Sequence, residues 1–149
     1  MNHLSAFILA MFLCTQGFAS SPFSLEALKG VNVTFLNKNK LLSEAFSASL
    51  QKEVEAKLQK AGIETSTKHF SNLLFKVQIQ NVKEITLVHV TLSLVENAHL
   101  KRSLPVDAIA ITYSKHDFFE TQSMELDLKE SIFFLLDEFI DQFKEENRQ

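Results

Sequence analysis

The sequence predicts an α+β fold: a two-layer β-α-β-β-β-β-α sandwich, with a mixed sheet of four to five strands and two helices on one face. Several strand-length segments alternate apolar and polar residues, which is typical of half-buried strands. Two longer segments repeat apolar residues every three or four positions, as helices with one apolar face do. The order of these segments gives one β-α-β crossover followed by hairpins, and two layers bury every apolar face.

The first strand and the first helix have clear signals. Residues 31–35 alternate apolar and polar side chains and predict a strand, which a polar connector at 37–40 follows. A helix of about five turns is expected next. Gly62 directly after it supplies a left-handed C-cap and ends the helix. The apolar face of this helix consists of Leu42, Phe46, Leu50, Val54, Leu58 and Ala61.

Four further segments are predicted as strands, and alternation is clear in the second and third of them. They are residues 63–68, 73–80, 85–96 and 106–114. A turn at 81–83 and a polar loop through Lys101 and Arg102 join the last three into hairpins. Pairing around these turns is expected to place residue 85 near residue 116 and residue 96 near residue 105.

A second helix is predicted from about residue 127 to residue 146. Asp127 and Glu130 have the spacing of a capping box, which places the start of the helix at Asp127. Its apolar stripe consists of Leu128, Ile132, Leu135, Leu136, Phe139 and Phe143. No repeat or internal boundary interrupts the chain, so residues 20–149 are expected to form a single α+β domain.

The N-terminus predicts export. Residues 4–13 form an apolar run with the length of a signal-peptide core, shorter than the roughly 20 residues of a membrane span. Small residues before Ser20 favour cleavage after Ala19, so residues 1–19 are the expected signal peptide. An uncleaved anchor, a buried first helix and a lipid-modified Cys14 are the alternatives. Cleavage would remove Cys14, the sole cysteine, and an exported chain without disulfides favours a bacterial periplasmic or outer-membrane-associated location.

Composition and spacing favour no enzymatic class. The 149 residues carry 15 Lys+Arg and 18 Asp+Glu, so the net charge of −3 argues against a nucleic-acid partner. Three glycines leave little material for a phosphate-binding loop, and no cofactor is expected. The expected strand pairing gathers His69, His89, His99 and His116 into no metal site. Ser114, His116 and Asp117 lack the sharp strand-to-helix turn of a hydrolase nucleophile. The expectation is therefore a protein that is not an enzyme.

Aromatic and acidic residues near the C-terminus are the candidates for partner contact. Residues 20–115 hold 12 basic and 8 acidic side chains, whereas residues 116–149 hold 3 basic and 10 acidic ones. On the last helix, Phe134 is expected among solvent-facing acids, as an aromatic anchor surrounded by charges that orient a basic partner. The adjacent Phe118 and Phe119 are expected on a connector, with one ring partly exposed. The candidate contact residues are Phe134, Phe118, Phe119, Asp137, Glu138 and Asp141.

Three segments carry a resemblance to a known group. Residues 28–33 (LKGVNV), 54–63 (VEAKLQKAGI) and 135–140 (LLDEFI) resemble small exported bacterial envelope proteins, many without an assigned function. The element order is similar to that of the lipopolysaccharide-assembly lipoprotein and the TolB N-terminal domain. The resemblance implies a non-catalytic role in the envelope, as a scaffold or assembly accessory with an envelope protein partner or as a homo-oligomer. A carrier or sensor of a hydrophobic ligand in the helix–sheet layer is the alternative.

Overall fold

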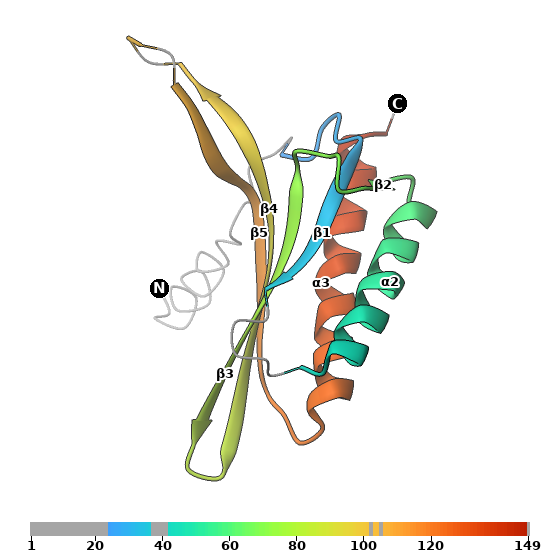
Figure 1. The fold of residues 1–149 in the computed structure, drawn as a ribbon, viewed down its shortest axis with the longest axis vertical. Helices are drawn as coiled ribbons and strands as arrows, with labels where there is room; N and C mark the ends of the chain where they lie inside the picture. The colour runs from blue at the N-terminus through green and yellow to red at the C-terminus, as the bar shows by residue number, and fades with distance from the viewer. Residues whose placement is uncertain (1–23, 37–41, 102, 105, 149) are drawn as a thin grey trace, which may run out of the picture.

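One mixed sheet with both helices on the same face makes up the fold (Figure 1). The computed structural model describes residues 24–36, 42–101, 103–104 and 106–148. The predicted α+β class and the β-α-β-β-β-β-α order are confirmed. The predicted signal peptide with Cys14, the connector at 37–40 and Arg102 lie outside the described residues.

The sheet has five strands in the order β2-β1-β3-β4-β5. The first three run parallel to one another, and β3, β4 and β5 form two antiparallel hairpins. The strands are β1 (Gly30–Leu36), β2 (Glu64–Thr65), β3 (Asn72–Val82), β4 (Ile85–Leu100) and β5 (Val106–Glu120). Strands β2 and β5 are the two edge strands of the sheet.

Helix α2 (Glu44–Lys60) ends as Gly62 predicts, but it begins two residues after Leu42, which was expected on its apolar face. The Ser43 hydroxyl accepts a hydrogen bond from the Phe46 N–H at 3.2 Å and caps the first turn. Gly62 follows the last turn with φ of 86°, a left-handed conformation that glycine adopts without strain. The N–H groups of Gly62 and Ile63 donate to the carbonyls of Gln59 and Leu58, which closes a Schellman motif.

Helix α3 (Met124–Glu146) begins three residues before the predicted start. The predicted capping box at Asp127 and Glu130 is wrong. The Asp127 carboxylate instead accepts hydrogen bonds from residues 121–123, which precede the helix. These backward contacts allow the helix to start at Met124.

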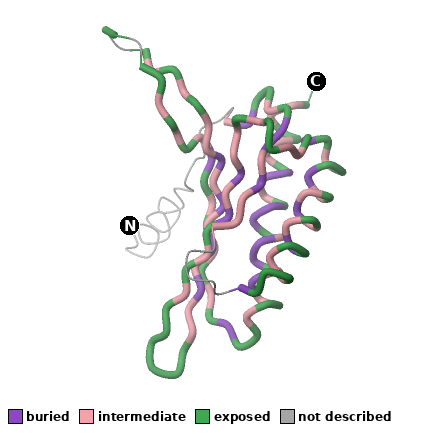
Figure 2. Tube along the Cα trace, viewed as in Figure 1, coloured by how far each residue is buried: buried purple, intermediate pink, exposed green. Residues whose placement is uncertain are grey.

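The core lies between the sheet and the two helices (Figure 2). Alternate side chains of β3 and β4 point into it, and α3 covers them with its apolar stripe. The Tyr113 ring meets the Phe139 ring edge to face, with centroids 5.1 Å apart. The largest fully buried side chains are Tyr113, Phe75, Phe139, Leu25, Leu50, Leu58, Ile63, Leu73, Leu92, Leu94, Leu128 and Ile132.

The β4–β5 hairpin is longer than predicted, and its register differs. Leu87 pairs with Glu120, and Glu96 pairs with Ala110, so the predicted partners of residues 85 and 96 were wrong. The polar residues 114–117 look like the end of a strand in the sequence, but they continue β5. Ser114 and His116 pair with the polar outer residues Ser93 and Thr91 of β4, whereas Lys115 and Asp117 pair with the buried Leu92 and Val90. Phe118 and Phe119 therefore lie in β5 and not on a connector, and they point to opposite faces of the sheet.

A register shift between Leu94 and Val95 changes the side of the sheet to which the following side chains of the hairpin point. Leu94 pairs with Tyr113 and Val95 with Ile111, so Thr112 is an extra residue on β5. Ile111 and Ile109 consequently turn away from the helix side, and they are 66% and 77% exposed. Beyond this bulge the hairpin projects from the body of the protein (Figure 1). We call residues 95–111 of this hairpin the arm.

Strand β2 is shorter than the predicted segment 63–68. After Thr65 the chain leaves the sheet edge and turns back toward β3 at Asn72. His69 in this turn lies against Gly30, where a Cβ atom would come within 2.5 Å of the ring Nε2. The absence of a side chain at Gly30 thus leaves space for the crossing segment.

The first and last described segments are bonded to each other. The Leu25 N–H donates to the Glu146 carboxylate at 2.6 Å. The Asn147 side chain accepts from the Ala27 N–H at 2.9 Å and donates to the Leu25 carbonyl at 2.9 Å. We call these three hydrogen bonds the terminal clasp.

Candidate partner-binding surface

The candidate surface lies where the edge strand β5 runs beside helix α3. The Thr121 N–H donates to the Thr86 carbonyl at 3.0 Å, so the backbone groups of Thr121 point toward β4. Along an antiparallel strand, the N–H and C=O groups of successive residues point alternately to the two sides. The backbone of Phe119 therefore faces β4, and the backbone groups of Phe118 and Glu120 face the open edge. The Phe118 N–H is bonded at 2.9 Å to the neighbouring Asp117 carboxylate.

Asp127 fixes the turn between β5 and α3. One of its oxygens accepts from the Thr121 hydroxyl at 2.7 Å and from the N–H groups of Gln122 and Ser123 at 3.2 and 3.1 Å. The Thr121 hydrogen bond, then the backbone hydrogen bonds, hold the pKa of Asp127 below its ordinary value, because they stabilise the carboxylate. This turn sets the first two turns of α3 against the end of β5.

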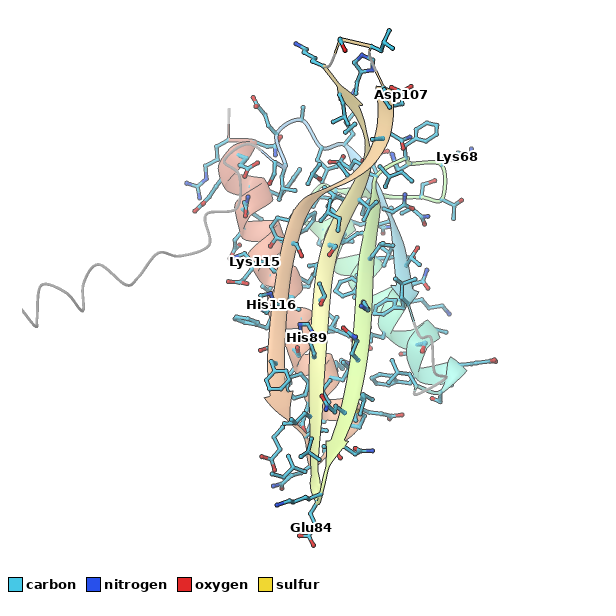
Figure 3. All side chains as sticks on the ribbon, turned by 90° about the vertical axis from the view of Figure 1, so that its left-hand side faces the viewer. Lys68, Glu84, His89, Asp107, Lys115 and His116 are labelled. Atoms are coloured by element: carbon cyan, nitrogen blue, oxygen red, sulfur yellow. The ribbon has the colours of Figure 1, made fainter. Side chains whose placement is uncertain are left out.

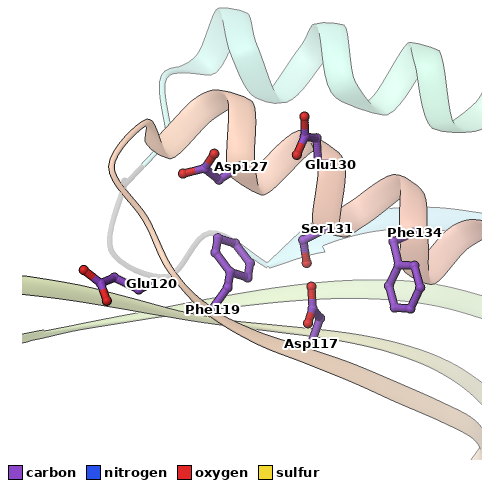
Figure 4. Close-up of a pocket in the computed structure, with 7 residues that line it drawn as sticks. All are labelled: Asp117, Phe119, Glu120, Asp127, Glu130, Ser131 and Phe134. Carbon is purple, nitrogen blue, oxygen red and sulfur yellow. The ribbon is translucent and has the colours of Figure 1, made fainter.

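A pocket of about 350 Å³ lies between β5 and α3 (Figure 4). The Phe119 and Phe134 rings stand on either side of it. Between them, the Ser131 hydroxyl and the Asp117 carboxylate point toward one another across the space. The lining residues are Asp117, Phe119, Glu120, Asp127, Glu130, Ser131 and Phe134, and we call this the β5–α3 pocket.

The β5–α3 pocket has an uncompensated negative charge. Four of its seven lining residues are acidic. Within the described part of the chain, no Lys, Arg or His forms an ion pair with any of these four carboxylates. Two acids farther along α3 are paired: Asp137 lies 2.7 Å from Lys57 of α2, and Glu138 lies 3.9 Å from Lys115 of β5.

The Ser131 hydroxyl is a buried polar group without a hydrogen-bond partner. Ser131 is 4% exposed, and its Oγ reaches no donor or acceptor of the protein. It sits within the apolar stripe of α3, between Leu128 and Ile132. A polar side chain within the apolar stripe of the helix is the sequence signal that could have predicted this pocket.

The six residues predicted to contact a partner do not share one site. Phe134 is 55% exposed and lines the β5–α3 pocket with the half-buried Phe119. Phe118 is 62% exposed on the opposite face of the sheet. Asp137 and Glu138 form the ion pairs described above. The Asp141 carboxylate is exposed and lies 4.0 Å from Lys144.

The outer face of the sheet holds a second cluster that the predicted register missed. His89 lies opposite Phe118 and beside His116, with the two imidazole centroids 5.7 Å apart (Figure 3). The Phe118 ring meets His89 edge to face at 6.3 Å. In the described part of the chain, no three His, Cys, Asp or Glu side chains are grouped so that they could hold a metal ion.

No known protein-family model and no curated protein sequence matches the chain. Among the described residues, no helix has the length and apolar character to cross a membrane.

Proposed function

We propose that this is a small exported, non-catalytic protein that acts through protein–protein contacts, as a scaffold or assembly accessory of the bacterial envelope. Its location is the periplasm or the outer membrane, reached through the signal peptide at residues 1–19. The observation that carries the contact-based function is the exposed Phe134 ring, which lies among carboxylates beside the open edge of β5.

Three features support the β5–α3 pocket as the contact surface. An aromatic ring at the centre of a polar rim is the usual arrangement of an interaction hot spot. An edge strand offers backbone groups to an added strand of a partner. The acidic residues of α3 and β5 would steer a basic partner toward the surface.

The test compares two exposed apolar residues of the same helix. Phe134 is 55% exposed and lines the pocket, and Leu126 is 58% exposed and does not line it. With the tagged protein expressed in its native host, Phe134→Ala is expected to reduce partner recovery at least about tenfold, the loss of a moderate hot spot. Leu126→Ala is expected to leave recovery and thermal stability unchanged. Equal recovery from Phe134→Ala and the wild type would contradict the proposal.

A groove at the other edge of the sheet supports the carrier of a hydrophobic ligand as a second candidate. It has a volume of about 540 Å³ and is lined by residues of β1 and of the first half of α2. Val33, Phe35 and Leu42 give it an apolar side. Its volume lies within the range of small-molecule sites.

Native mass spectrometry of the protein from its host tests the carrier function. A carrier should retain a hydrophobic molecule, and Ala48→Phe, which fills the groove, should release it. Ala56→Phe, at an exposed position of the same helix, is the matched control. A ligand-free mass for the wild type would leave the contact-based function alone.

A further inference from the structure

We propose that the β5–α3 pocket binds the guanidinium group of an arginine side chain that a partner presents to the edge of β5. This inference rests on the proposed function, because it names the chemistry that the contact surface recognises. The rings of Phe119 and Phe134, the unpaired carboxylates and the buried hydroxyl of Ser131 all line one space of about 350 Å³.

The charge of the pocket selects a cation. Asp127 is already occupied by its three hydrogen bonds to the turn. The carboxylates of Glu120 and Glu130 accept no hydrogen bond from the described residues, and Asp117 accepts only the Phe118 N–H. A cation that enters the pocket therefore meets acceptors that no other group of the described chain neutralises.

The shape of the pocket favours an organic cation with several donors. The acceptors lie on both walls, with Asp117 and Glu120 on β5 and Glu130 and Ser131 on α3. A planar guanidinium has five N–H donors and can bond to both walls at once. The aromatic rings on either side provide faces for cation–π contact (Figure 4).

The Ser131 hydroxyl is an independent sign of a ligand. A buried hydroxyl that makes no hydrogen bond costs free energy, so such groups call for a specific reason. Its oxygen points across the pocket toward Asp117 (Figure 4). An N–H group placed between the two would bond to the carboxylate and give the hydroxyl its missing partner.

A partner segment that pairs with the open edge of β5 would bring its arginine side chain to the pocket. Phe118 and Glu120 direct backbone groups away from β4, next to the mouth of the pocket. An extended partner segment along this edge would place alternate side chains on the α3 side of the sheet. One arginine on that side reaches the pocket, and its neighbours in the sequence point away from it.

The experiment titrates the protein with N-acetyl-arginine amide and with N-acetyl-citrulline amide, its neutral isostere. Amide resonances of residues 117–120 and 130–134 in a ¹⁵N-labelled sample report binding. The arginine probe is expected to give saturable shifts with a dissociation constant in about the millimolar range. The citrulline probe is expected to bind about tenfold more weakly, because it lacks the charge.

Substitutions locate the effect. Glu130→Gln and Asp117→Asn are each expected to weaken the arginine response about tenfold while the thermal midpoint stays unchanged. Asp141→Asn removes an equal charge from α3 outside the pocket and should leave the response as it is. Equal shifts from both probes, shifts that never saturate, or an equal loss in Asp141→Asn would each overturn the arginine pocket.

The two proposals fail separately. If Phe134→Ala abolishes partner recovery but the arginine probe does not bind, the contact surface stands and the guanidinium pocket is wrong. If the probe binds in the pocket and Phe134→Ala leaves recovery unchanged, the pocket stands and the surface is not where the partner docks.

Discussion

At the scale of single residues, two polar groups lie in opposite environments. The Tyr113 hydroxyl is buried in the core and has no hydrogen-bond partner. Burial first, and then the charges of Glu138 and Glu146, raise the pKa of Tyr113 above its ordinary value, so the hydroxyl stays protonated in the folded protein. Asp127 instead has three donors and stays ionised. The first group costs stability, and the second contributes to it.

Replacing Tyr113 by Phe should not destabilise the protein. The substitution removes an unpartnered buried hydroxyl and keeps the ring that packs on Phe139, so the free energy of unfolding should stay the same or rise by up to about 1–3 kcal/mol. Urea unfolding at neutral pH measures the change. Tyr113→Leu, which also loses the edge-to-face contact, should lower stability. A loss of more than about 1 kcal/mol in Tyr113→Phe would mean that the hydroxyl has a partner.

The Asp127 cluster predicts a contribution to stability that depends on pH. Because the pKa of Asp127 is lower in the folded state than in the unfolded chain, its contribution is complete above about pH 4 and is lost as the pH falls through the folded-state value. Asp127→Asn should therefore be less stable than the wild type at pH 7, and the difference should shrink in acid. Urea unfolding across this pH series provides the measurement. Glu125→Gln, on the same first turn but outside the cluster, should show no such change, and a constant difference for Asp127→Asn would contradict the assignment.

At the scale of elements, local patterns predicted helix positions better than strand ends. The stop signal at Gly62 depends on one residue and its own helix, and it was readable from the sequence. The length of β5 depends on the partner that β4 offers to residues 114–120, which alternation in β5 alone does not reveal. The bulge at Thr112 also arises from pairing, and it turns Ile109 and Ile111 to the face of the sheet opposite to that of Tyr113.

The arm should be dispensable for folding. It projects beyond the helices, and its His99–Asp107 pair is exposed. Replacing residues 98–108 by Asn-Gly joins Asn97 to Ile109, which already pair, through a turn that suits a hairpin. The free energy of unfolding should change by less than about 1 kcal/mol.

Thermal and urea denaturation of the shortened chain check this expectation. Leu92→Ala in the body of β4 provides the contrast, because truncation of a fully buried leucine should cost about 2–5 kcal/mol. An unfolded or strongly destabilised chain without the arm would show that the arm contributes to the core.

At the scale of the whole molecule, the β5–α3 pocket depends both on the acidic residues near the C-terminus and on the fold that brings them together. The sequence located the acidic surplus after residue 115 and placed Phe134 within it. It could not place Asp117 and Ser131 face to face, because that requires the register of β5 and the packing of α3 on the sheet. The candidate pocket is therefore a tertiary feature, built from residues whose individual patterns look ordinary.

The proposed export predicts the mass of the whole mature chain. Protein isolated from its native host should have the intact mass of residues 20–149, because the small residues Gly17 and Ala19 suit signal cleavage after Ala19. Intact-mass spectrometry makes the measurement. A mass that includes residues 1–19, or a lipid adduct on Cys14, would contradict the prediction. Expression of the segment that begins at Ser20, without its leader, provides the reference mass.

The terminal clasp has a consequence for the order of events during synthesis. Leu25 and Glu146 are 121 positions apart, so a ribosome adds nearly the whole domain before the first segment meets its partner. Until then a nascent chain lacks α3, and the apolar faces of β3 and β4 stay uncovered. A chain that cannot fold until its last helix has been synthesised stays unfolded enough to pass through a translocation channel. Until then its exposed apolar faces need a chaperone to prevent aggregation.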